Sequence, residues 1–572
     1  MIKKDFSQDK RTILPRLEKK LGLIGGNKIN LANGWCVMVD LKPNEIETYG
    51  FSPDLAADMV EKGIDLRLTR KILDKFNQGA YDHIEPVKVS DIPEVDGKTV
   101  FDISGAITVE LDATTAQRNI DRLGLAIDLT QIGRSTDTRI TFNKTELTRL
   151  GIMLYPVVSY GVLNGGSASS YFDLKKNRGF NEKLFEICRA EFAALAAVAK
   201  DKAKGLAPAY INRDRSIGPT FIELKMRAIL IQILNYRINV GNARCLEPMF
   251  QMTSVYNNDL IRESYLELKD SPYLHDLIVE TGVDITAFKS GIQPMLAALT
   301  HSREGRPKSL FTKAYGHENN TLPMPGGHGQ NFEILSDIYQ ELYQAGIRFV
   351  YLGNVDNLGY TVNPTALALI ALYHKQAGFD FSFRTAVDIK GGILIYDQYN
   401  RLNCADIGPA ISPAEVFEAE KSGKSILFNC ATGLFNLEYL IESLDLIIEN
   451  LPVRITDQDK DAGHYSQAEQ VTWEIIGMLD NFMIFGVDKY DRFLAAKLVL
   501  EGLMASGVGL NHPDYPTDPA HPKNDLRGIA LKLNKGLEQK LATVYGMKKT
   551  GDRWEPRSVV ELREELRRET IV

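Results

Sequence analysis

Between about residues 151 and 500, the sequence alternates runs rich in β-branched and aromatic residues with runs of helical periodicity. This alternation restricts the fold more than any other feature, because strands separated by helices usually pair in parallel and have both faces of their sheet covered. We therefore predict an α/β fold with a mixed, mostly parallel central sheet flanked by helices. Strands are expected at residues 156–163, 247–255, 347–355 and 379–387, and helices at residues 181–203, 220–239, 257–269, 330–345 and 364–376.

At roughly 150 residues per domain, a chain of 572 residues is long enough for two to four domains, and its pattern divides it into three segments. Residues 1–150 mix short helices and strands and are interpreted as an N-terminal α/β extension. Residues 151–504 hold the predicted core. Residues 505–572 begin with NHPDYPTDPAHPKND, whose prolines and aspartates indicate a loop, and continue as a mostly helical C-terminal tail. The charged helix SVVELREELRRET in this tail is interpreted as a surface that faces solvent or another subunit, so a homo-oligomer remains open.

The composition excludes several classes of partner. Lys and Arg number 67 against 74 Asp and Glu, and the formal net charge of −7 predicts no general attraction to nucleic acid or to membranes. The first residues lack the apolar core of a signal peptide, and no run of about 18 apolar residues predicts a transmembrane helix. Five scattered cysteines without C-x-x-C spacing are typical of reduced thiols, so we predict a cytoplasmic protein without a disulfide framework.

The stretch YGVLNGGSASSYFDLKKN, residues 160–177, is an apolar run that leads into Gly165 and Gly166. Glycines at the carboxyl end of a parallel strand let backbone N–H groups approach a phosphate or a base without a Cβ in the way. The spacing matches neither the dinucleotide-binding nor the Walker glycine pattern, so neither of those mechanisms applies. A plain turn is the other interpretation of this loop.

Two further segments carry groups suited to anions. FVYLGNVDNLGYTVNP, residues 349–364, is a β run after which Asp356 is placed to hold Mg²⁺ together with the phosphate oxygens of a ligand, or else to cap an Asx turn. PMPGGHGQNF, residues 323–332, sets glycines around His328 just before a helical pattern. Such a segment attracts anions, and His328 is either a donor to a phosphate or nucleobase or a structural histidine.

Six short motifs follow one another along the chain, namely LNGG, GGHG, NVDNLG, DIKGG (388–392), LFN (427–429) and RFLAAK (492–497). In this order they resemble the UTP–glucose-1-phosphate uridylyltransferase family, whose corresponding stretches read close to LNGG-L-G-T, PPGHGD, N-[IV]-DNLGA, D-[VI]-KGG, FN-T-NN and RFLPVK. The resemblance spans about residues 150–500. NVDNLG and DIKGG are specific to the glucose branch, since the related N-acetylhexosamine pyrophosphorylases differ at both places.

The resemblance implies a nucleotide-diphospho-sugar transferase fold, Rossmann-like and of the GT-A type, with N-terminal and C-terminal additions. Residues 151–504 would then be a catalytic nucleotidyltransferase domain that forms UDP-glucose and pyrophosphate from UTP and glucose 1-phosphate, with Mg²⁺ as cofactor. The residues implied for this reaction are the catalytic cations Lys390 and Lys497, the nucleotide-binding residues Leu163, Asn164, Gly165, Gly166, Gly327 and His328, the sugar-binding residues Asn357, Gly359, Asn429 and Thr432, and the metal ligand Asp356.

The chain departs from the family pattern in two places. After LNGG it reads SASSYFDLKKN, without the family's further glycine and proline. Lys175 and Lys176 are therefore candidates for the lysine that holds the triphosphate, although their spacing does not match the family's. The paired asparagines of FN-T-NN are replaced by Ala431 and Thr432, which leaves the identity of the hexose open.

Two other functions are compatible with these departures. One is a UDP-sugar pyrophosphorylase that acts on N-acetylglucosamine or galactose 1-phosphate. The other is a nucleotide-sugar-binding relative that has lost catalysis, but the retention of Asp356, Lys390 and Lys497 argues against it. The side chain that reads the uracil is open as well, with Met252 and Thr253 in the expected neighbourhood.

Overall fold

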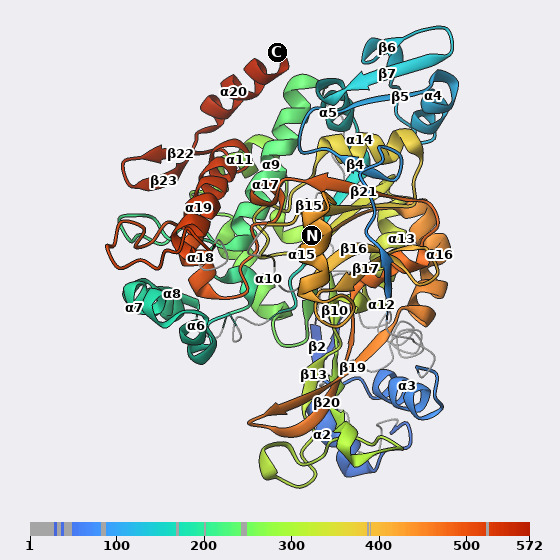
Figure 1. Cartoon of the computed structure of the whole chain (residues 1–572), viewed down its shortest axis with the longest axis vertical. Coiled ribbons are helices and arrows are strands. Elements are labelled where there is room, and N and C mark those ends of the chain that lie inside the picture. The colour runs from blue at the N-terminus through green and yellow to red at the C-terminus, as the bar shows by residue number, and fades with distance from the viewer. Residues whose placement is uncertain are drawn as a thin grey trace, which may run out of the picture.

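A computed structural model of the chain describes residues 28–30, 36–38, 48–81, 87–166, 171–199, 202–241, 249–385, 388, 391–521 and 525–571. Helices surround a central sheet, and an arm extends from it at the bottom of the view in Figure 1. None of the helices in these ranges is long and apolar enough to cross a membrane. Lys390 lies outside the described residues.

The centre of the molecule is a sheet of 11 described strands (Figure 1). They are β3 (Val89–Asp91), β4 (Val100–Asp102), β8 (Val158–Leu163), β9 (Met249–Ser254), β10 (Lys289–Gln293), β14 (Phe349–Asn354), β15 (Ala377–Phe383), β16 (Gly392–Asp397), β17 (Leu402–Asp406), β18 (Leu427–Asn436) and β21 (Phe482–Val487). The main row runs β10-β9-β8-β14-β18-β15-β21-β4, and β16 joins β18, β17 and β3. Pairing along the row is parallel except at β18, which is antiparallel to both of its neighbours. The predicted mixed, mostly parallel sheet is confirmed, and its four predicted strands are β8, β9, β14 and β15.

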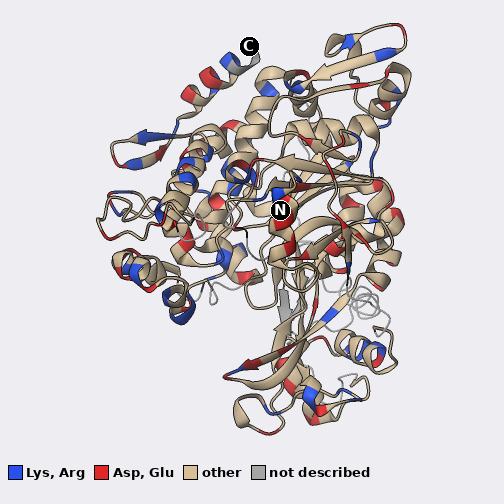
Figure 2. Cartoon of the chain, viewed as in Figure 1, with Lys and Arg blue, Asp and Glu red and all other residues tan. Residues whose placement is uncertain are grey.

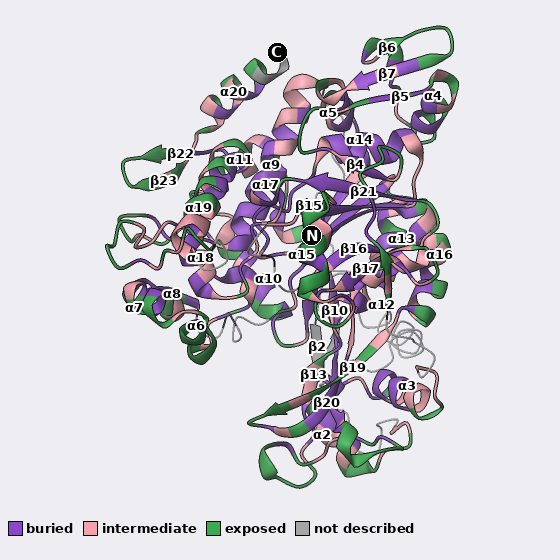
Figure 3. Ribbon diagram, in the orientation of Figure 1, coloured by how far each residue is buried: buried purple, intermediate pink, exposed green. Residues whose placement is uncertain are grey.

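Helices cover both faces of this sheet, and the alternation of side chains along β14 shows the two buried layers. Phe349 and Tyr351 belong to one buried cluster, whereas Val350 and Leu352 belong to the other. The first cluster lies against α5 (Lys144–Met153), α9 (Phe221–Asn239) and α14 (Pro364–Tyr373), and the second against α12 (Asn331–Ile334), α13 (Ser336–Gln344) and α16 (Leu437–Asn450). Figure 3 shows this buried interior along the sheet and the helices that cover it.

The predicted helix at 220–239 is α9, and its first turn explains where it begins. Thr220 accepts a hydrogen bond from the backbone of Glu223, whose side chain in turn accepts one from the backbone of Thr220, so both orphan amides are satisfied. The other predicted helices correspond to α7 (Glu182–Ile187) with α8 (Arg189–Ala199), α10 (Asn258–Leu268), α12 with α13, and α14. Further described helices of the body include α11 (His275–Thr281) and α15 (Pro413–Lys421).

The N-terminal segment takes part in the same sheet. β4 pairs in parallel with β21, and β3 pairs with β16. Other parts of the segment form the antiparallel pair β1 (Lys28–Asn30) and β2 (Cys36–Met38), and a small sheet with its helix, made of β5 (Thr108–Asp112), α4 (Ala113–Asp121), β6 (Arg134–Ser135) and β7 (Arg139–Asn143). Strands from both sides of residue 150 therefore belong to the same central sheet.

The arm is assembled from three separate stretches of the chain. They supply α2 (Pro53–Glu61) and α3 (Leu66–Asn77), then β11 (Met295–Ala297), β12 (Leu299–Thr300) and β13 (Pro323–Pro325), and finally β19 (Val453–Lys460) and β20 (Gly463–Gln470). Three small buried clusters stabilise it. In the view of Figure 2, acidic and basic residues are interspersed over the arm and the body, as the small net charge predicts.

The C-terminal tail is packed against the body of the protein. It contains α19 (Leu526–Thr543), β22 (Met547–Thr550), β23 (Arg553–Pro556) and α20 (Val559–Ile571), and α18 (Val499–Ala505) directly precedes it. Arg227 of α9 is buried and donates to the carbonyl oxygens of Tyr545 at 2.6 Å, Gly546 at 2.9 Å and Arg557 at 3.1 Å. One buried guanidinium thus fixes the tail to the helix that covers the sheet.

Candidate active site

The central parallel strands end at one edge of the sheet. Leu163, the last residue of β8, is paired with Asn354 of β14 on one side and with Met252 of β9 on the other. β18 enters the sheet at the same edge, with Thr432 opposite Gly353. The loops that follow β8, β9 and β14 therefore gather where ligands bind in open α/β sheets.

The LNGG loop after β8 directs its carbonyl groups into the protein. The side-chain amide of Asn257 donates to the carbonyl oxygens of Gly165 at 3.0 Å and Asn164 at 3.3 Å, and the backbone N–H of Lys204 donates to that of Gly166 at 3.1 Å. Within the described structure, the N–H groups of Gly165 and Gly166 have no hydrogen-bond partner. Two neighbouring backbone donors are thus available to an anion or a base.

Gln293, the last residue of β10, lies between the LNGG loop and the GGHG segment. Its Nε2 donates to the carbonyl oxygen of Gly327 and to Oε1 of Gln330, both at 2.7 Å. A Cβ placed on Gly165 would come to 3.3 Å from its Oε1. Gly327 has φ +82°, and a Cβ there would collide with the carbonyl group of Gln470, so the conformation and the close approach both require glycine.

The two side chains expected near the base are directed elsewhere. Met252 is packed in a buried cluster, and the hydroxyl of Thr253 bonds to Oδ1 of Asn258 at 2.9 Å. Gln293 occupies the expected neighbourhood instead. The sequence reasoning missed it because the order of strands in the sheet brings the end of β10 close to the LNGG loop; the polar residue that ends the run KSGIQ was the only local signal.

His328 is held by Thr472 through one ring nitrogen. The backbone N–H of Thr472 donates to Nδ1 at 3.1 Å, so the proton of the neutral ring is assigned to Nε2. Burial lowers the pKa of His328 to about 4, which keeps the ring neutral near pH 7. Because Nε2 has no partner within the described residues, the ring presents an N–H donor rather than a charge.

This low pKa predicts a pH dependence of stability. The pKa of His328 is about 4 in the folded protein, against the ordinary value of 6.5, so the unfolded chain binds more protons between these two pH values. We expect the free energy of unfolding to decrease as the pH falls from about 6.5 to about 4, by at most about 1.4 kcal/mol per pH unit from this group. Urea unfolding of the wild type and of His328→Asn across this range measures it, and equal slopes would contradict the expectation.

Lys204, in the loop before α9, joins three of the sequence motifs. Its backbone bonds to Gly166 in LNGG, its ammonium forms an ion pair with Asp356 in NVDNLG, and the same ammonium donates to the carbonyl oxygen of Ala496 in RFLAAK at 3.0 Å. The ring of Tyr171 lies 5.0 Å from the ammonium. The side chains of the ion pair are 18% and 13% exposed, so an anionic ligand can reach them. Three loops thus meet at one residue, Lys204.

Comparisons with known proteins agree with this arrangement of motifs. A family model described as UTP–glucose-1-phosphate uridylyltransferase matches residues 281–508, which include GGHG, NVDNLG and RFLAAK. The chain is 24% identical over 361 residues to a UTP–glucose-1-phosphate uridylyltransferase of Musa acuminata, covering 60% of this chain and 70% of that protein. It is 30% identical over 204 residues to a probable UTP–glucose-1-phosphate uridylyltransferase of Schizosaccharomyces pombe, covering 34% of this chain and 40% of that protein. Residues 281–508 of the chain thus match the UTP–glucose-1-phosphate uridylyltransferase family.

Solved structures show the same fold. The uridine diphosphate N-acetylglucosamine pyrophosphorylase of Trypanosoma brucei, in complex with an inhibitor, superposes with a TM-score of 0.52 at 14% identity. The match covers 87% of this chain and 92% of that chain. The fold is therefore that of the UDP-sugar pyrophosphorylases, as the sequence motifs predicted.

The two lysines that the sequence offered for the family's triphosphate position lie on α6 (Leu174–Phe180). Lys175 and Lys176 are both exposed there, and α6 is attached to α18 by Asn177, whose Oδ1 accepts from the backbone of Leu500 at 3.0 Å. Lys204 follows α6, α7 and α8 and is the lysine that contacts the site loops. The sequence reasoning missed it because three helices separate it from LNGG. Its stretch KGLAP, a lysine beside a glycine and near a proline, was the available signal.

Asn357 and Gly359 attach the NVDNLG loop to the RFLAAK segment. Nδ2 of Asn357 donates to the carbonyl oxygen of Arg492 at 3.1 Å, and its Oδ1 accepts from the backbones of Leu494 and Gly359, both at 3.0 Å. A Cβ on Gly359 would collide with the backbone of Arg492. A sugar contact by the Asn357 amide would therefore require these bonds to open.

Lys497 stands at the end of RFLAAK with its side chain exposed. The segment is fixed from behind by Arg492, which forms a buried ion pair with Asp380 of β15 at 2.8 Å and donates to the carbonyl oxygen of Thr361 at 3.0 Å. The backbone N–H of Lys497 donates to Glu501 at 2.7 Å. In the described structure no carboxylate pairs with the Lys497 ammonium, so its charge is available to a ligand.

The DIKGG and LFN motifs lie side by side near β18. The carboxylate of Asp388 is buried and pairs with Lys489 of α17 (Lys489–Arg492), and Gly391 packs so closely on the ring of Phe428 that a Cβ would collide with it. Phe428 directly precedes Asn429. The described residues of DIKGG, Asp388, Gly391 and Gly392, thus lie beside the predicted sugar-binding segment.

Asn429 and Thr432 have side chains that bond within this segment. Oδ1 of Asn429 accepts from the backbone of Ala431 at 2.8 Å, and its Nδ2 approaches the sulfur of Cys404 at 3.5 Å. The buried hydroxyl of Thr432 is 3.4 Å from the carbonyl oxygen of Cys430. Ala431 has φ +51°, a left-handed conformation that alanine rarely adopts and asparagine tolerates.

Proposed function

We propose that this protein catalyses the transfer of a uridylyl group from UTP to glucose 1-phosphate, which forms UDP-glucose and pyrophosphate, and that Mg²⁺ assists the reaction. The observation that carries the proposal is the junction at Lys204, where LNGG, NVDNLG and RFLAAK meet beside the carboxylate of Asp356. Free backbone donors, an exposed lysine and an accessible carboxylate at the strand ends suit a polyphosphate substrate.

The reaction requires little covalent chemistry from the protein itself. A phosphate oxygen of the sugar 1-phosphate attacks the α-phosphorus of UTP, the bond from that phosphorus to the bridging oxygen breaks, and pyrophosphate leaves. Both reactants are anionic, so the protein must neutralise charge and align the attack. Since a phosphate monoester is already a competent nucleophile, we propose neither a general base nor a covalent intermediate.

The uridine is assigned to the LNGG loop and the GGHG segment that faces it across Gln293. The N–H groups of Gly165 and Gly166 are the proposed donors to the nucleotide, with Leu163 and Asn164 lining the same loop. Gly327 supplies the opposite side, where a Cβ has no room. The neutral ring of His328 is proposed to position the nucleotide through Nε2–H rather than to remove a proton.

Asp356 is the proposed metal ligand. Within the described residues, no group of three or more His, Cys, Asp and Glu side chains is arranged to hold a metal ion. In phosphoryl-transfer sites, however, Mg²⁺ is commonly held by one or two carboxylates together with substrate phosphates, and one accessible carboxylate fits that mode. When bound, the ion would neutralise phosphate oxygens and favour departure of pyrophosphate. The ion pair with Lys204 keeps this carboxylate oriented toward the LNGG loop.

The proposed fixed cations are Lys204, Lys497 and Lys390. Lys204 takes the role of the triphosphate lysine, because it contacts the LNGG loop and Asp356 together. Lys497 and Lys390 are proposed to stabilise the α-phosphate and the sugar phosphate, as the family resemblance implies. A lysine acts as a compact point charge that suits both tasks.

The assignment of Lys204 makes Lys175 and Lys176 testable. Both side chains are exposed on α6, so we expect Lys175→Ala and Lys176→Ala to retain turnover and the KM for UTP within about threefold of the wild type. Steady-state kinetics of the two single variants measure this. A large loss of turnover or a large rise in the KM for UTP in either variant would indicate that the substituted lysine of α6 holds the triphosphate.

A second candidate is the same reaction with another hexose 1-phosphate, either N-acetylglucosamine or galactose 1-phosphate. One observation favours it: Ala431 and Thr432 stand where paired asparagines would face the sugar, and the Thr432 hydroxyl lies against its own strand. A binding protein without catalysis is the third possibility.

Release of pyrophosphate from UTP and Mg²⁺, measured with a panel of sugar 1-phosphates, separates these functions. Turnover with glucose 1-phosphate alone is the expected result. Turnover only with another sugar would replace the substrate but keep the reaction. If calorimetry shows UDP-glucose binding while no sugar 1-phosphate releases pyrophosphate, the catalytic proposal is wrong.

A further inference from the structure

Lys225 of α9 is a charged group that the mechanism above does not use. Its side chain is fully buried, and no carboxylate in the described part of the chain forms an ion pair with it. Its ammonium donates instead to the carbonyl oxygens of Asn357 and of Tyr360, the latter at 2.7 Å. A buried charge without a carboxylate in contact is unfavourable for folding, so its presence needs a reason.

The two carbonyl groups are the ends of a single turn. The backbone N–H of Tyr360 donates to the carbonyl oxygen of Asn357 at 3.0 Å, which closes the turn that begins directly after Asp356. Asn357 also holds the RFLAAK segment through the backbone of Leu494. One ammonium therefore fixes the turn on which both the proposed metal ligand and the segment before Lys497 depend.

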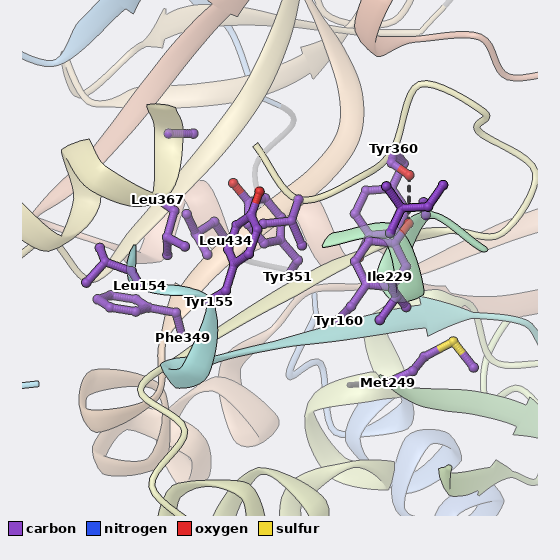
Figure 4. Close-up of a cluster of buried hydrophobic side chains, with 14 of the residues drawn as sticks. Leu154, Tyr155, Tyr160, Ile229, Met249, Phe349, Tyr351, Tyr360, Leu367 and Leu434 are labelled. Carbon is purple, nitrogen blue, oxygen red and sulfur yellow. Dashed lines mark hydrogen bonds between the residues drawn. The ribbon is translucent and has the colours of Figure 1, made fainter. Parts of the chain in front are cut away.

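Neutral donors hold the same turn from other sides. The hydroxyl of Tyr160 donates to the backbone carbonyl oxygen of Tyr360 at 2.6 Å, and the rings of these two residues are stacked. Figure 4 shows the two tyrosines and a hydrogen bond between them as a dashed line. The hydroxyl of Tyr545, from the C-terminal tail, donates to the carbonyl oxygen of Leu358 at 2.7 Å. Neutral hydroxyl groups are thus sufficient as hydrogen-bond donors to carbonyl oxygens of this turn. Lys225 differs from these two tyrosines because its donor group can carry a positive charge.

The charge of Lys225 interacts with Asp356. Burial lowers the pKa of Lys225 well below its usual range, whereas the Asp356 carboxylate acts in the opposite direction and favours the charged ammonium; Arg492 and Lys540 act against it. Lys204 contacts the Asp356 carboxylate directly, whereas Lys225 is bonded to the backbone of the next residue, Asn357.

We propose that Lys225 is a positioning residue for uridylyl transfer: its buried ammonium, bonded to the carbonyl oxygens of Asn357 and Tyr360, fixes the turn after Asp356 and keeps this carboxylate oriented for the metal and the phosphates. The proposal rests on the proposed function of the site. It predicts that the metal–phosphate part of the site depends on Lys225, whereas binding of the base does not.

Lys225→Gln tests this, because glutamine keeps an N–H donor and removes the charge. We expect kcat to fall about tenfold or more, because the lost interaction acts on alignment in the transition state. Binding of Mn²⁺ in the presence of UTP, followed by electron paramagnetic resonance, should weaken about tenfold, and UMP binding by calorimetry should be unchanged. Lys225→Arg, which keeps the charge, should recover part of the Mn²⁺ affinity.

The matched controls are Tyr160→Phe and Tyr545→Phe, which remove neutral donors to the same turn. Both should keep Mn²⁺ affinity and kcat close to the wild type. Wild-type Mn²⁺ affinity in Lys225→Gln would overturn the proposal, and so would an equal loss in the two phenylalanine variants, because a charge would then not be needed. Absence of turnover in the wild type would instead refute the proposed function, since the Mn²⁺ and UMP measurements do not depend on turnover.

Discussion

Asp356→Asn is expected to lower the turnover of uridylyl transfer by about 10²- to 10³-fold while the protein stays folded. Asparagine has nearly the same shape as aspartate but carries no charge, so it neither attracts Mg²⁺ nor pairs with Lys204, whose ammonium contacts this carboxylate. The surrounding turn is held through backbone carbonyls by Lys225 and Tyr545, and those bonds do not involve the side chain that is changed. Turnover should therefore decrease strongly, whereas the free energy of unfolding should change little.

Pyrophosphate release at varied Mg²⁺, together with thermal unfolding, measures both effects. Asp58→Asn is a matched control, because Asp58 forms a comparably exposed ion pair with Lys62 at 2.7 Å in the arm, where none of the six motifs lies. This control should leave turnover and its dependence on Mg²⁺ unchanged. Unchanged turnover of Asp356→Asn at limiting Mg²⁺ would show that the metal is held elsewhere and that Asp356 serves only Lys204.

The fold class follows from the sequence because it depends on a repeated local pattern. β8, β9 and β14 lie within predicted strands, β15 overlaps the fourth, and α9 starts where its capping residues are found. The place of β4 in the central sheet was not predicted, because three residues, Val100–Asp102, carry no periodicity and their pairing with β21 is decided by tertiary packing. Strand order is likewise a property of packing.

The same distinction applies to the site. Gly165, Gly166 and Asp356 were recognisable from local signals, namely glycines and a carboxylate at the ends of β runs. Lys204 and Gln293 were missed, because each reaches the LNGG loop through the arrangement of the whole chain: Lys204 after three intervening helices, and Gln293 from the strand at the end of the row. Proximity in sequence favoured lysines on α6 instead.

A related lesson concerns residue types that suit two tasks. Asn357 has the side chain expected of a sugar ligand, yet it is 2% exposed and its amide is bonded to the backbone of the RFLAAK segment. Asn429 is bonded to the backbone of Ala431 in a similar way. An amide beside a binding site satisfies neighbouring backbone groups as readily as it satisfies a ligand, and sequence alone does not separate the two uses.

Lys204→Met is expected to lower kcat by about 10²- to 10³-fold, as loss of a fixed cation near a phosphate does in other enzymes. Methionine keeps much of the buried stem but removes the ammonium that bonds to Asp356 and to the carbonyl oxygen of Ala496. The backbone bond from residue 204 to Gly166 is unaffected by the substitution, so the LNGG loop keeps its shape and UMP should bind as in the wild type. We therefore expect a large loss of kcat together with unchanged binding of UMP.

Single-turnover kinetics with UTP and glucose 1-phosphate, together with UMP calorimetry, measure this signature. The matched control is Lys202→Met, the same change on an exposed lysine of the same loop, which should behave as the wild type. The free energy of unfolding should change by no more than about 1 kcal/mol in Lys204→Met, because the ion pair that is lost is partly open to solvent. If Lys204→Met retains wild-type turnover, then the meeting of three loops at Lys204 is only a structural junction, and the cation that neutralises the triphosphate must come from Lys497, Lys390 or α6.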